Sequence, residues 1–544
     1  MSAGAHVGRA GRLWPALAAA ALVGLYAAPR LRGLTDSCLW FDELFGVHAA
    51  RHDWGGLWRF VAADLIHPPL FYALLKIWAA AGGESLLWLR LFPALTSVAA
   101  LVPFLLLARE LRLPRAAAGL ALLLAAANGY LIKYAQEVRM YGLLLLLSLF
   151  SLWLLARLLA ARGAGPARRH AALFAANLLL AYTHYYGWLV VAGEAAFLLF
   201  AARRKLPRFL ITAALVAACL APWMVACARE AAAGGGLAQN IGWIERPGAK
   251  DLAGFFALLH APFNFQRSSD EPAFSTAGAL AGLLLVGLPV ALLLLRALRR
   301  RRARDDDDEG DAVEIFWAGA GGGRRAVAFL AFFALFPVAA AALASYALPH
   351  SVWGARHLIV AAGPYMLLAG LALARLRLAW LKASALVLLG CWLVLAGALS
   401  LARRQPAPVW CAWGDLAASA AREETAGAAR VFAFEDLVAY HVWFALDGGR
   451  GDGRFKVAVV KGVEGVHEDP AFFLPRRFEG VERAGAGALE GPRFWVAFRD
   501  RAWDESRPPL GLLRERGYRF ERVFEAPARG QRAFFVLASR GGAE

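Results

Sequence analysis

The sequence is poor in charged residues, and its apolar residues come in long runs with few polar residues between them. Asp, Glu, Lys and Arg make up 18% of the 544 residues, whereas they make up about a quarter of a typical soluble domain. Hydrophobic residues make up 60%, and the mean hydropathy is +0.50. This composition excludes an ordinary soluble enzyme. The length is sufficient for several membrane spans and one domain outside the membrane.

The sequence also lacks the signatures of nucleotide and metal sites. It contains no phosphate-binding loop and no regular spacing of metal ligands, so we assign no cofactor and no metal-binding residue, and a divalent metal stays an open alternative without support in the sequence. The five cysteines form no framework. Cys38 and Cys411 fall on the same side of the membrane in the topology derived below, and a disulfide between them and two free thiols are both compatible with the sequence.

Long apolar segments predict a polytopic α-helical membrane protein with about eleven transmembrane helices. The expected spans are Leu13–Ala28, Ser85–Ala108, Ala116–Ile132, Tyr141–Ala160, Ala171–Tyr182, Gly187–Ala201, Phe209–Ala228, Ala273–Leu295, Ala326–Leu348, Leu358–Ala374 and Trp380–Leu401.

The positive charge of the chain predicts its orientation in the membrane. Lys and Arg number 59 against 41 Asp and Glu, a net charge of +18, and the basic residues gather in every second loop. By the positive-inside rule these loops are cytoplasmic, as is the N-terminus, and the protein is a multi-pass protein of the cytoplasmic (inner) membrane. The loops 31–67 and 229–272 and everything after Arg403 then lie outside. Because the basic residues follow topology, we expect membrane lipids and no nucleic acid as partners.

Two features near the N-terminus leave alternatives open. The segment Pro68–Gly82 is apolar but short for a full crossing, so we interpret it as an interfacial or re-entrant helix. The first apolar segment is either a membrane span or a cleaved signal peptide, although Pro29 and Arg30 suit cleavage poorly. Either choice leaves the next loop outside.

The chain changes character after residue 403, which divides it into a transmembrane domain, 1–403, and a second domain, 404–544. In the second domain short β-rich runs alternate with helical stretches, and this order predicts a small extracytoplasmic α/β domain. The expected strands are Val431–Phe434, Phe455–Val460, Phe494–Phe498 and Phe534–Leu537, and the expected helices are Leu416–Glu424, Leu437–Leu446 and Leu510–Arg516.

Adjacent carboxylates lie among aromatic residues in the first outer loop, 31–67. Asp42 and Glu43 follow Trp40 and Phe41 in this loop. At a membrane surface such carboxylates lose solvation, which raises their affinity for protons and suits a general base for an alcohol or amine nucleophile. The alternative is that acids at this place cap the N-terminus of a helix, and composition alone favours this second interpretation.

Basic residues lie at the outer ends of other expected spans. Lys133 and Arg139 lie near one turn, His184 lies with Tyr185 and Tyr186 at the next, and His350, Arg356 and His357 lie at a third. Ionisable residues at such depths usually face a bundle interior or an aqueous cavity. Several cations that converge there would suit a lipid-linked phosphate. The alternative for each single residue is snorkelling at the interface or pairing with a neighbouring glutamate.

Four motifs in the first 200 residues resemble the GT-C glycosyltransferases. They are Trp40–Glu43, Asp64 with His67–Tyr72, Leu89–Leu95 and Tyr134–Tyr141. Their order and spacing are similar to those of the branch that holds the protein O-mannosyltransferases and the lipid A aminoarabinose transferases, glycosyltransferase family 39 and its relatives. The later helices resemble this branch only in hydropathy.

The resemblance implies an enzyme that takes a sugar from a polyprenyl-phosphate donor on the outer side of the membrane. The acceptor would be a hydroxyl-bearing protein, lipid or glycan. The essential acid of the family maps onto Asp42, with Glu43 beside it, and its phosphate-binding arginine maps onto Arg139. The expected site therefore comprises Asp42 and Glu43 as catalytic residues, Arg139, Lys133, Arg356 and His357 at the donor phosphate, and Asp64, His67 and Tyr185 at the substrate. The stretch before Arg356 departs from the family, since Gly354 and Ala355 stand in place of a proline-rich pattern.

Two other functional classes remain open. A flippase or transporter of lipid-linked sugars would need internal repeats or helices broken at mid-membrane, and the chain shows no obvious repeat. A non-catalytic membrane scaffold would use its outer α/β domain to bind a partner. Neither class needs a carboxylate pair flanked by aromatic residues at the membrane surface.

Overall fold

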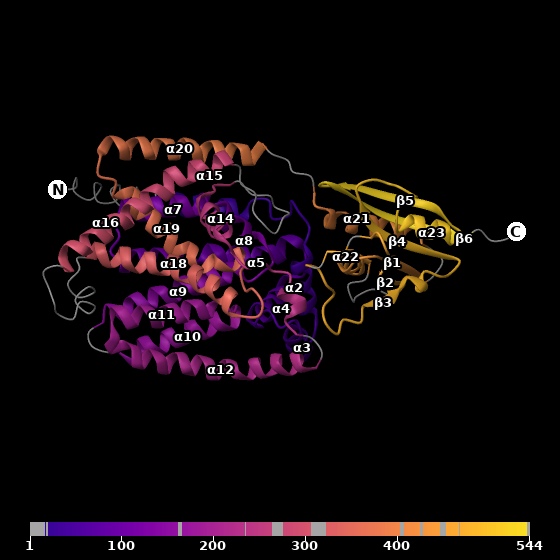
Figure 1. Cartoon of the computed structure of the whole chain (residues 1–544), viewed down its shortest axis with the longest axis horizontal. Helices are drawn as coiled ribbons and strands as arrows, with labels where there is room; N and C mark the ends of the chain where they lie inside the picture. Colours follow the sequence, from indigo (N-terminus) through magenta and orange to yellow (C-terminus); the bar gives the residue numbers. More distant parts are fainter. Residues whose placement is uncertain are drawn as a thin grey trace, which may run out of the picture. The chain divides into compact units, whose positions relative to one another are not determined.

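The computed structural model describes residues 17, 20–161, 166–233, 236–263, 276–305, 322–402, 407–424, 428–446, 453–466, 468–469 and 471–540, with the backbone alone at 300–305 and 322. The chain forms two compact units, whose elements are labelled in Figure 1. Unit 1 comprises Met1–Leu34, Ile66–Leu74 and Trp78–Arg403, and unit 2 comprises Thr35–Leu65, Leu75–Ile77 and Arg404–Glu544.

Unit 1 is helical throughout the part of it that the structure describes. Its elements are a helix Ala20–Leu31, α4 (Leu70–Gly82, most of which belongs to this unit), α5 (Leu86–Ala99), α6 (Leu101–Glu110), α7 (Arg115–Ala127), α8 (Gly129–Gln136), α9 (Tyr141–Leu159), α10 (Ala167–Thr183), α11 (Gly187–Ala201), η1 (Arg203–Lys205), α12 (Leu206–Ala232), α13 (Ala238–Ile241), α14 (Ala249–His260), α15 (Thr276–Gly282), the π-helical turn η2 (Leu283–Gly287), α16 (Leu288–Asp305), α18 (Gly322–Ala347), η3 (Ala355–Leu358), α19 (Ile359–Ala374) and α20 (Ala379–Ala402).

Seven helical stretches among the described residues are long and apolar enough to cross a membrane, and each coincides with an expected span. They are Leu86–Glu110, Tyr141–Leu159, Arg203–Ala232, Thr276–Arg299, Gly323–Ala347, Ala355–Ala374 and Ala379–Ala402. The segments expected at Ala116–Ile132, Ala171–Tyr182 and Gly187–Ala201 form shorter helices, and Leu13–Ala28 lies partly outside the described residues. The number of about eleven spans therefore stays a prediction. The short segment after Pro68 forms the thirteen-residue helix α4.

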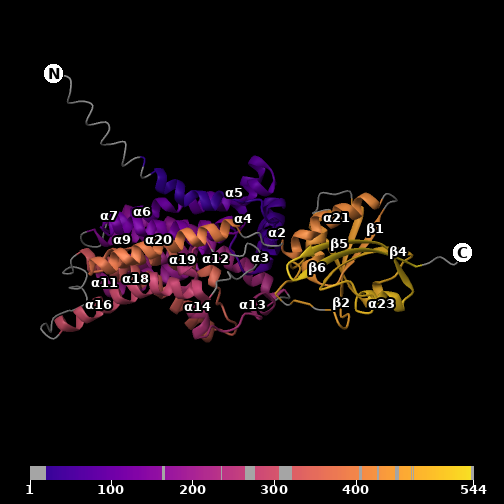
Figure 2. The same ribbon diagram turned by 90° about the horizontal axis from the view of Figure 1, so that it is seen from above.

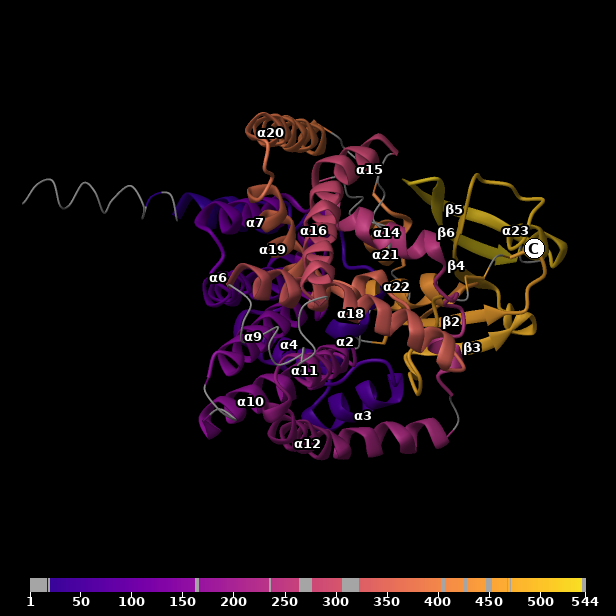
Figure 3. The ribbon, with the colours of Figure 1, turned by 60° about the vertical axis from the view of Figure 1, so that its left-hand side comes forward.

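Helix α19 is the centre of unit 1, because neighbours cover almost all of its surface. It packs against α7, α9, α16 and α18, which Figure 3 shows around it. A Cβ atom at Gly370 would lie 2.4 Å from the backbone oxygen of Ala117 in α7. Glycine therefore allows the two backbones to approach as closely as they do, in the way that small residues join membrane helices. In contrast, α20 exposes apolar residues such as Val394 along most of its length.

Asn128 ends α7 and begins α8, so the apolar segment expected to be one helix is two. Its side-chain oxygen accepts from the backbone N–H of Leu131 at 3.0 Å, which caps α8. Its amide nitrogen donates to the carbonyl oxygens of Leu258 and Leu259 at the end of α14, both at 3.1 Å. The same side chain thus interrupts one helix, starts the next and binds a third.

Unit 2 is an α/β domain around a six-stranded sheet of order β3-β2-β1-β4-β6-β5, drawn from a second side in Figure 2. The first four strands in this order are parallel, and β6 and β5 add antiparallel pairs. Its elements are α2 (Phe41–Arg51), α3 (Trp54–Asp64), η4 (Val409–Cys411), α21 (Ala412–Glu423), β1 (Ala429–Ala433), α22 (Asp436–Leu446), β2 (Phe455–Lys461), β3 (Val481–Gly485), η5 (Ala486–Ala488), β4 (Arg493–Asp500), α23 (Leu510–Glu515), β5 (Tyr518–Ala528) and β6 (Gln531–Arg540).

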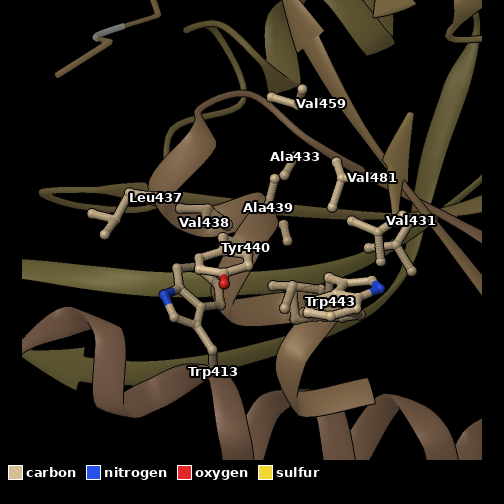
Figure 4. Packing of buried hydrophobic residues seen from close by; sticks show 14 of the residues in the cluster. Trp413, Val431, Ala433, Leu437, Val438, Ala439, Tyr440, Trp443, Val459 and Val481 are labelled. Atoms are coloured by element: carbon tan, nitrogen blue, oxygen red, sulfur yellow. The ribbon is translucent and has the colours of Figure 1, made fainter. Parts of the chain in front are cut away.

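Both faces of this sheet are buried, which explains why its strands are continuous apolar runs in the sequence. Along β1, Val431 faces the helices α21 and α22, and Phe432 faces the opposite core with α23. Figure 4 shows Trp413 of α21 and Tyr440 and Trp443 of α22 beside the strand residues of the first face. The four expected strands correspond to β1, β2, β4 and β6.

The first outer loop belongs to unit 2, because α2 packs on α22. Phe41 of α2 lies 5.3 Å from Tyr440 and 5.2 Å from Phe472 between ring centroids. Cys38, just before α2, forms a disulfide with Cys411 in η4. The sequence left this pairing open. Residues 35–65, which we placed in the transmembrane domain, thus form one compact unit with the C-terminal sheet.

A cavity of about 450 Å³ lies at the carboxyl ends of β1 and β4 in unit 2. After β1 the chain continues to β2 on one side, and it returns to β4 on the other side. Open α/β sheets bind ligands at such a switch point. An ion pair of the buried Glu435 and the half-buried Arg499 lies in the wall, with Nε and Nη2 of Arg499 at 2.6 and 2.8 Å from the two carboxylate oxygens of Glu435.

Candidate functional site

Arg139 and His67 meet inside unit 1, although they are far apart in the sequence. Arg139 lies in the short connection between α8 and α9, and His67 lies just before α4. Nη2 of the arginine is 3.2 Å from Nε2 of the histidine, and Nη1 donates to the hydroxyl of Tyr72 in α4 at 3.4 Å. The side chains of Arg139, His67 and Tyr72 are all buried. Two members of the expected site are therefore brought into direct contact.

His184 joins them from the turn between α10 and α11. The ring centroids of His67 and His184 are 5.3 Å apart. Nδ1 of His184 accepts the backbone N–H of Tyr186 at 3.0 Å, which fixes the ring within the turn. Nε2 of His184 is buried and has no hydrogen-bond partner among the described residues. This nitrogen therefore has a hydrogen-bonding capacity that a bound ligand could satisfy.

His357 completes the set from η3, at the start of α19. Its ring centroid lies 4.6 Å from that of His184 and 6.4 Å from that of His67. A Cβ atom at Gly354 would lie 2.5 Å from Nδ1 of His357, so the glycine makes room for this ring. The departure from a proline-rich pattern at Gly354 thus has a local packing reason. We refer to His67, His184 and His357 as the histidine group.

Burial keeps two members of the histidine group neutral at neutral pH. It lowers the pKa of His184 to about 3, and the nearby charges of Arg139 and Arg356 act in the same direction. The pKa of His67 is held well below its ordinary value, first by burial and then by the charge of Arg139. The positive charge of the site therefore comes from the two arginines, and these histidines contribute hydrogen-bonding groups.

The positions of the ring protons decide whether the histidine group fits a metal ion or an anion. One nitrogen from each ring lies within 4.8 Å of the others, a spacing that could hold a metal ion. However, Nδ1 of His184 accepts a hydrogen bond, so the proton of the neutral ring is on Nε2. Nε2 of His67 faces a guanidinium that can only donate, so its proton is on Nδ1. Two of the three rings then have no lone pair for a cation, and the group fits an anion better.

Two other expected residues of unit 1 point elsewhere. Nζ of Lys133 in α8 lies 3.8 Å from a carboxylate oxygen of Glu137, the residue directly after this helix. The hydroxyl of Tyr185 accepts from the indole N–H of Trp223 in α12 at 3.0 Å. The charge of Arg356, in contrast, acts on His67 and His184. The structure thus associates Arg139, His67, Arg356 and His357, and the expected roles of Lys133 at the phosphate and Tyr185 at the substrate stay predictions.

The expected acidic residues lie in unit 2. Asp42 and Glu43 are in the first turn of α2, and Asp64 is the last residue of α3. Glu43 is buried, and its carboxylate accepts the backbone N–H of Trp40 at 3.0 Å. Glu43 thus caps the start of α2, a role that the sequence offered as an alternative for the acids near Asp36 or Asp42. Asp42 is half-buried beside it, and its role as a base stays a prediction.

His184 belongs to a turn that the sequence indicated, but the expected set of site residues contained only Tyr185 from that turn. The signal that could have identified it is its position directly after an apolar helix, where an N–H donor can face the same side as Arg139. Which of two adjacent side chains turns inward depends on backbone angles that the sequence pattern does not fix.

No family model matches the chain, and no curated protein matches it. Among solved structures, ArnT from Cupriavidus metallidurans bound to undecaprenyl phosphate is similar at a TM-score of 0.55 and 13% identity, over 97% of this chain and 98% of ArnT. The same enzyme in the apo state is similar at 0.46 and 13% over the same shares. An oligosaccharyltransferase from Archaeoglobus fulgidus, in complex with Zn and sulfate, gives 0.42 and 15% over 78% of this chain and 61% of that protein.

The likeness to ArnT in its lipid-bound form extends over nearly the whole of both chains, so it includes the helices and the C-terminal sheet. At 13% identity it concerns the fold alone. The chain has a fold similar to that of ArnT, and this similarity agrees with the resemblance that the four sequence motifs indicated.

Proposed function

We propose that the protein is a membrane glycosyltransferase that moves a sugar from a polyprenyl-phosphate donor to an acceptor hydroxyl. The observation that carries the proposal is the buried pairing of Arg139 with the histidine group in unit 1. The fixed tautomers of His67 and His184 present N–H donors, and Arg139 and Arg356 supply positive charge. A buried set of this kind fits a phosphate monoester or diester. The similar fold of ArnT, whose structure contains undecaprenyl phosphate, supports this assignment.

The chemistry needs a leaving group whose negative charge is stabilised as the anomeric C–O bond breaks. Arg139 would contact the phosphate of the donor, and Nε2–H of His184 would donate to a second phosphate oxygen. Because both groups are held by other side chains or by the backbone, they need little rearrangement when charge develops. The donor sugar already carries its activating phosphate, so a nucleotide is not required.

The acceptor hydroxyl must lose its proton to the enzyme. We propose Asp42 as the general base, since Glu43 is occupied by its hydrogen bond to the backbone of Trp40. Asp64 belongs to the same unit and is proposed to contact the substrate. The transfer would take place at the outer face of the cytoplasmic membrane. The disulfide between Cys38 and Cys411 supports this location for unit 2, since disulfides persist in oxidising compartments.

The cavity at the switch point of the sheet is the part of unit 2 that we propose for acceptor selection. Glu435, Arg499, Asp500 and Arg501 line it, so its formal charges cancel. A neutral polar group with donors and acceptors side by side, such as a glycan or a peptide backbone, would match such a lining. Gln531 lies in the wall, and Gln531→Trp would reduce the space available. The variant should alter the range of acceptors used and leave donor binding unchanged.

The decisive experiment follows release of free polyprenyl phosphate in purified protein reconstituted into lipid. A panel of radiolabelled polyprenyl-phosphate sugars is supplied together with membrane extract as the source of acceptors. Wild type is compared with Asp42→Asn and Arg139→Gln, and with two controls, Asp36→Asn in the same outer loop and Arg168→Gln at the far end of α10. All variants are compared at matched folding.

The proposal expects release with wild type and both controls, and a loss of at least a hundredfold with Asp42→Asn and with Arg139→Gln. Undiminished release with Asp42→Asn would remove Asp42 as the base and leave it a helix-capping role. Transport of labelled donor across the bilayer without any release would favour a flippase. Absence of both donor binding and release across the panel would favour a scaffold that binds a partner through unit 2.

A further inference from the structure

Three buried polar side chains meet in the middle of unit 1, away from the histidine group. They are Ser151 of α9, Asn177 of α10 and Glu194 of α11, and all three are fully buried. Figure 1 shows these three helices side by side. Oγ of Ser151 lies 2.6 Å from Oδ1 of Asn177 and 2.6 Å from Oε1 of Glu194. Nδ2 of Asn177 lies 2.7 Å from Oε2 of Glu194, which closes a ring of three contacts.

The ring contains one proton too few if Glu194 is ionised. The amide of Asn177 supplies the proton for its contact with Oε2, and the hydroxyl of Ser151 has one proton for two oxygen neighbours. One oxygen pair at 2.6 Å would then have no proton between its atoms. Turning the amide of Asn177 by 180° does not help, because it places two oxygens 2.7 Å apart instead. A proton on Glu194 satisfies every contact in either orientation.

A second observation supports the same protonation state. No Lys, Arg or His forms an ion pair with Glu194 among the described residues, and water is excluded from the hydrocarbon core of a bilayer. An ionised carboxylate without a cation is among the most costly groups to bury. A neutral acid in a closed ring has each donor matched to an acceptor and carries no net charge.

We propose that Glu194 is a positioning residue, held as a neutral acid in a ring with Ser151 and Asn177 that fixes α9, α10 and α11 relative to one another. The placement of these helices gives the ring its role, and this role rests on the proposed function. Helix α9 begins two residues after Arg139, and His184 stands between the end of α10 and the start of α11. The ring therefore ties together the helices that carry two phosphate-binding groups.

Infrared spectroscopy tests the protonation state without any assay of activity. A protonated carboxylic acid has a C=O stretch above the amide I band, where ionised carboxylates do not absorb. The difference spectrum of wild type minus Glu194→Gln, both reconstituted in lipid at neutral pH, should contain this band. Its absence would overturn the proposal. Glu194→Gln keeps one donor and one acceptor at this position, so the variant should fold.

The positioning role is tested by comparing conservative and disruptive variants. Glu194→Gln should keep donor turnover within about twofold of wild type, whereas Glu194→Leu and Asn177→Leu should lower it at least tenfold, mainly in kcat. Equal losses in Glu194→Gln and Glu194→Leu would contradict a neutral ring. If the protein proved not to be a transferase, the infrared band would still be present, so failure of the proposed function and failure of the ring are distinguishable.

Discussion

Nη2 of Arg139 lies 3.2 Å from Nε2 of His67, and a guanidinium can only donate, so the histidine is the acceptor. This contact, with that of Nη1 to the hydroxyl of Tyr72, holds the arginine head in one orientation. The orientation matters because planar guanidinium groups bind phosphate through two parallel N–H bonds. His67 thus acts on the proposed donor phosphate through Arg139.

His67→Phe should therefore lower donor turnover, because the ring remains and the acceptor is lost. A hydrogen bond to a charged group contributes about 1.5–3 kcal/mol, which corresponds to a loss of roughly 10- to 100-fold. His67→Gln keeps an acceptor and should lose less. The measurement is single-turnover release of polyprenyl phosphate at matched folding. The control is His170→Phe, which lies near the start of α10 and so at the end of this helix away from His184. If His67→Phe kept wild-type turnover, Arg139 would not depend on this contact.

Removal of metal ions should leave the activity unchanged. The tautomers of His67 and His184 present N–H donors, so the histidine group has too few lone pairs for tight binding of zinc. Protein purified without chelator should contain well under one equivalent of zinc by mass spectrometry, and treatment with EDTA should not change donor turnover. One tightly bound zinc ion whose loss abolished turnover would mean that the Nδ1 contact of His184 rearranges on binding.

Unit 2 should lose stability as the pH falls from about 6.5 to about 4. Burial lowers the pKa of His441 from its ordinary value of 6.5 to about 4, and it lowers the pKa of His48 to about 3. The unfolded chain takes up these protons first as the pH falls, so it is favoured in this window and the effect is absent above it. Each histidine contributes on the order of 3 kcal/mol at the acid end.

Hydrogen exchange of unit 2 in the full chain, measured from pH 7 to pH 4, checks this prediction. His441→Asn keeps a donor for the backbone oxygen of Leu437 and removes one titrating group. It should reduce the loss of protection on acidification. An identical pH profile in wild type and the variant would show that His441 does not titrate between the folded and unfolded states.

Reduction of the disulfide between Cys38 and Cys411 should loosen α2. Native disulfides in small extracellular domains typically contribute about 2–5 kcal/mol. Cys38→Ser should therefore increase hydrogen exchange in α2 and α21 and lower donor turnover, since Asp42 lies in the first turn of α2. Cys391→Ser removes an exposed free cysteine of α20 and is the matched control. Unchanged exchange in Cys38→Ser would show that packing alone holds the helix.

A larger side chain at Gly370 should prevent correct folding of unit 1. A Cβ there would lie 2.4 Å from the backbone oxygen of Ala117, so Gly370→Leu must separate α19 from α7. Thermal denaturation in detergent should show a large loss of stability or no folded protein. Gly390→Leu in α20 has nothing within 4 Å of the added Cβ and is the control. Similar melting temperatures for the two variants would contradict the close approach of these helices.

The long membrane helices and the buried strands could be predicted from the sequence, because continuous runs of apolar residues identify both. The seven long spans follow from length and hydropathy, and β1, β2, β4 and β6 follow from apolar runs. Strand β5 was missed because it is at the edge of the sheet and polar residues alternate along it, as in Glu521 and Glu525. Strand β3 is equally short of buried residues.

The site was predictable in part, for a similar reason. Arg139 and His67 occur in motifs whose order is visible in the chain, His357 lies at the outer end of an expected span, and the structure brings the three together. The expected set took Tyr185 and not His184 from one turn, and for Lys133 the sequence left a phosphate and a neighbouring glutamate open as partners; the structure places Nζ of Lys133 3.8 Å from Glu137. These choices depend on which way a side chain turns from its helix, and that is set by tertiary packing.

Unit 2 is assembled from three pieces of chain, Thr35–Leu65, Leu75–Ile77 and Arg404–Glu544, and most of the described helices of unit 1 lie between the second and the third. Phe41 and Leu44 of α2 share a core with Trp413, Tyr440 and Val431, which a ribosome reaches much later. In the proposed topology, α2 is therefore exported without its packing partners, and the carboxylate of Asp42 has no fixed surroundings until the strands of the sheet have followed. The timing of biosynthesis thus delays the completion of the proposed catalytic loop to the last stage of export.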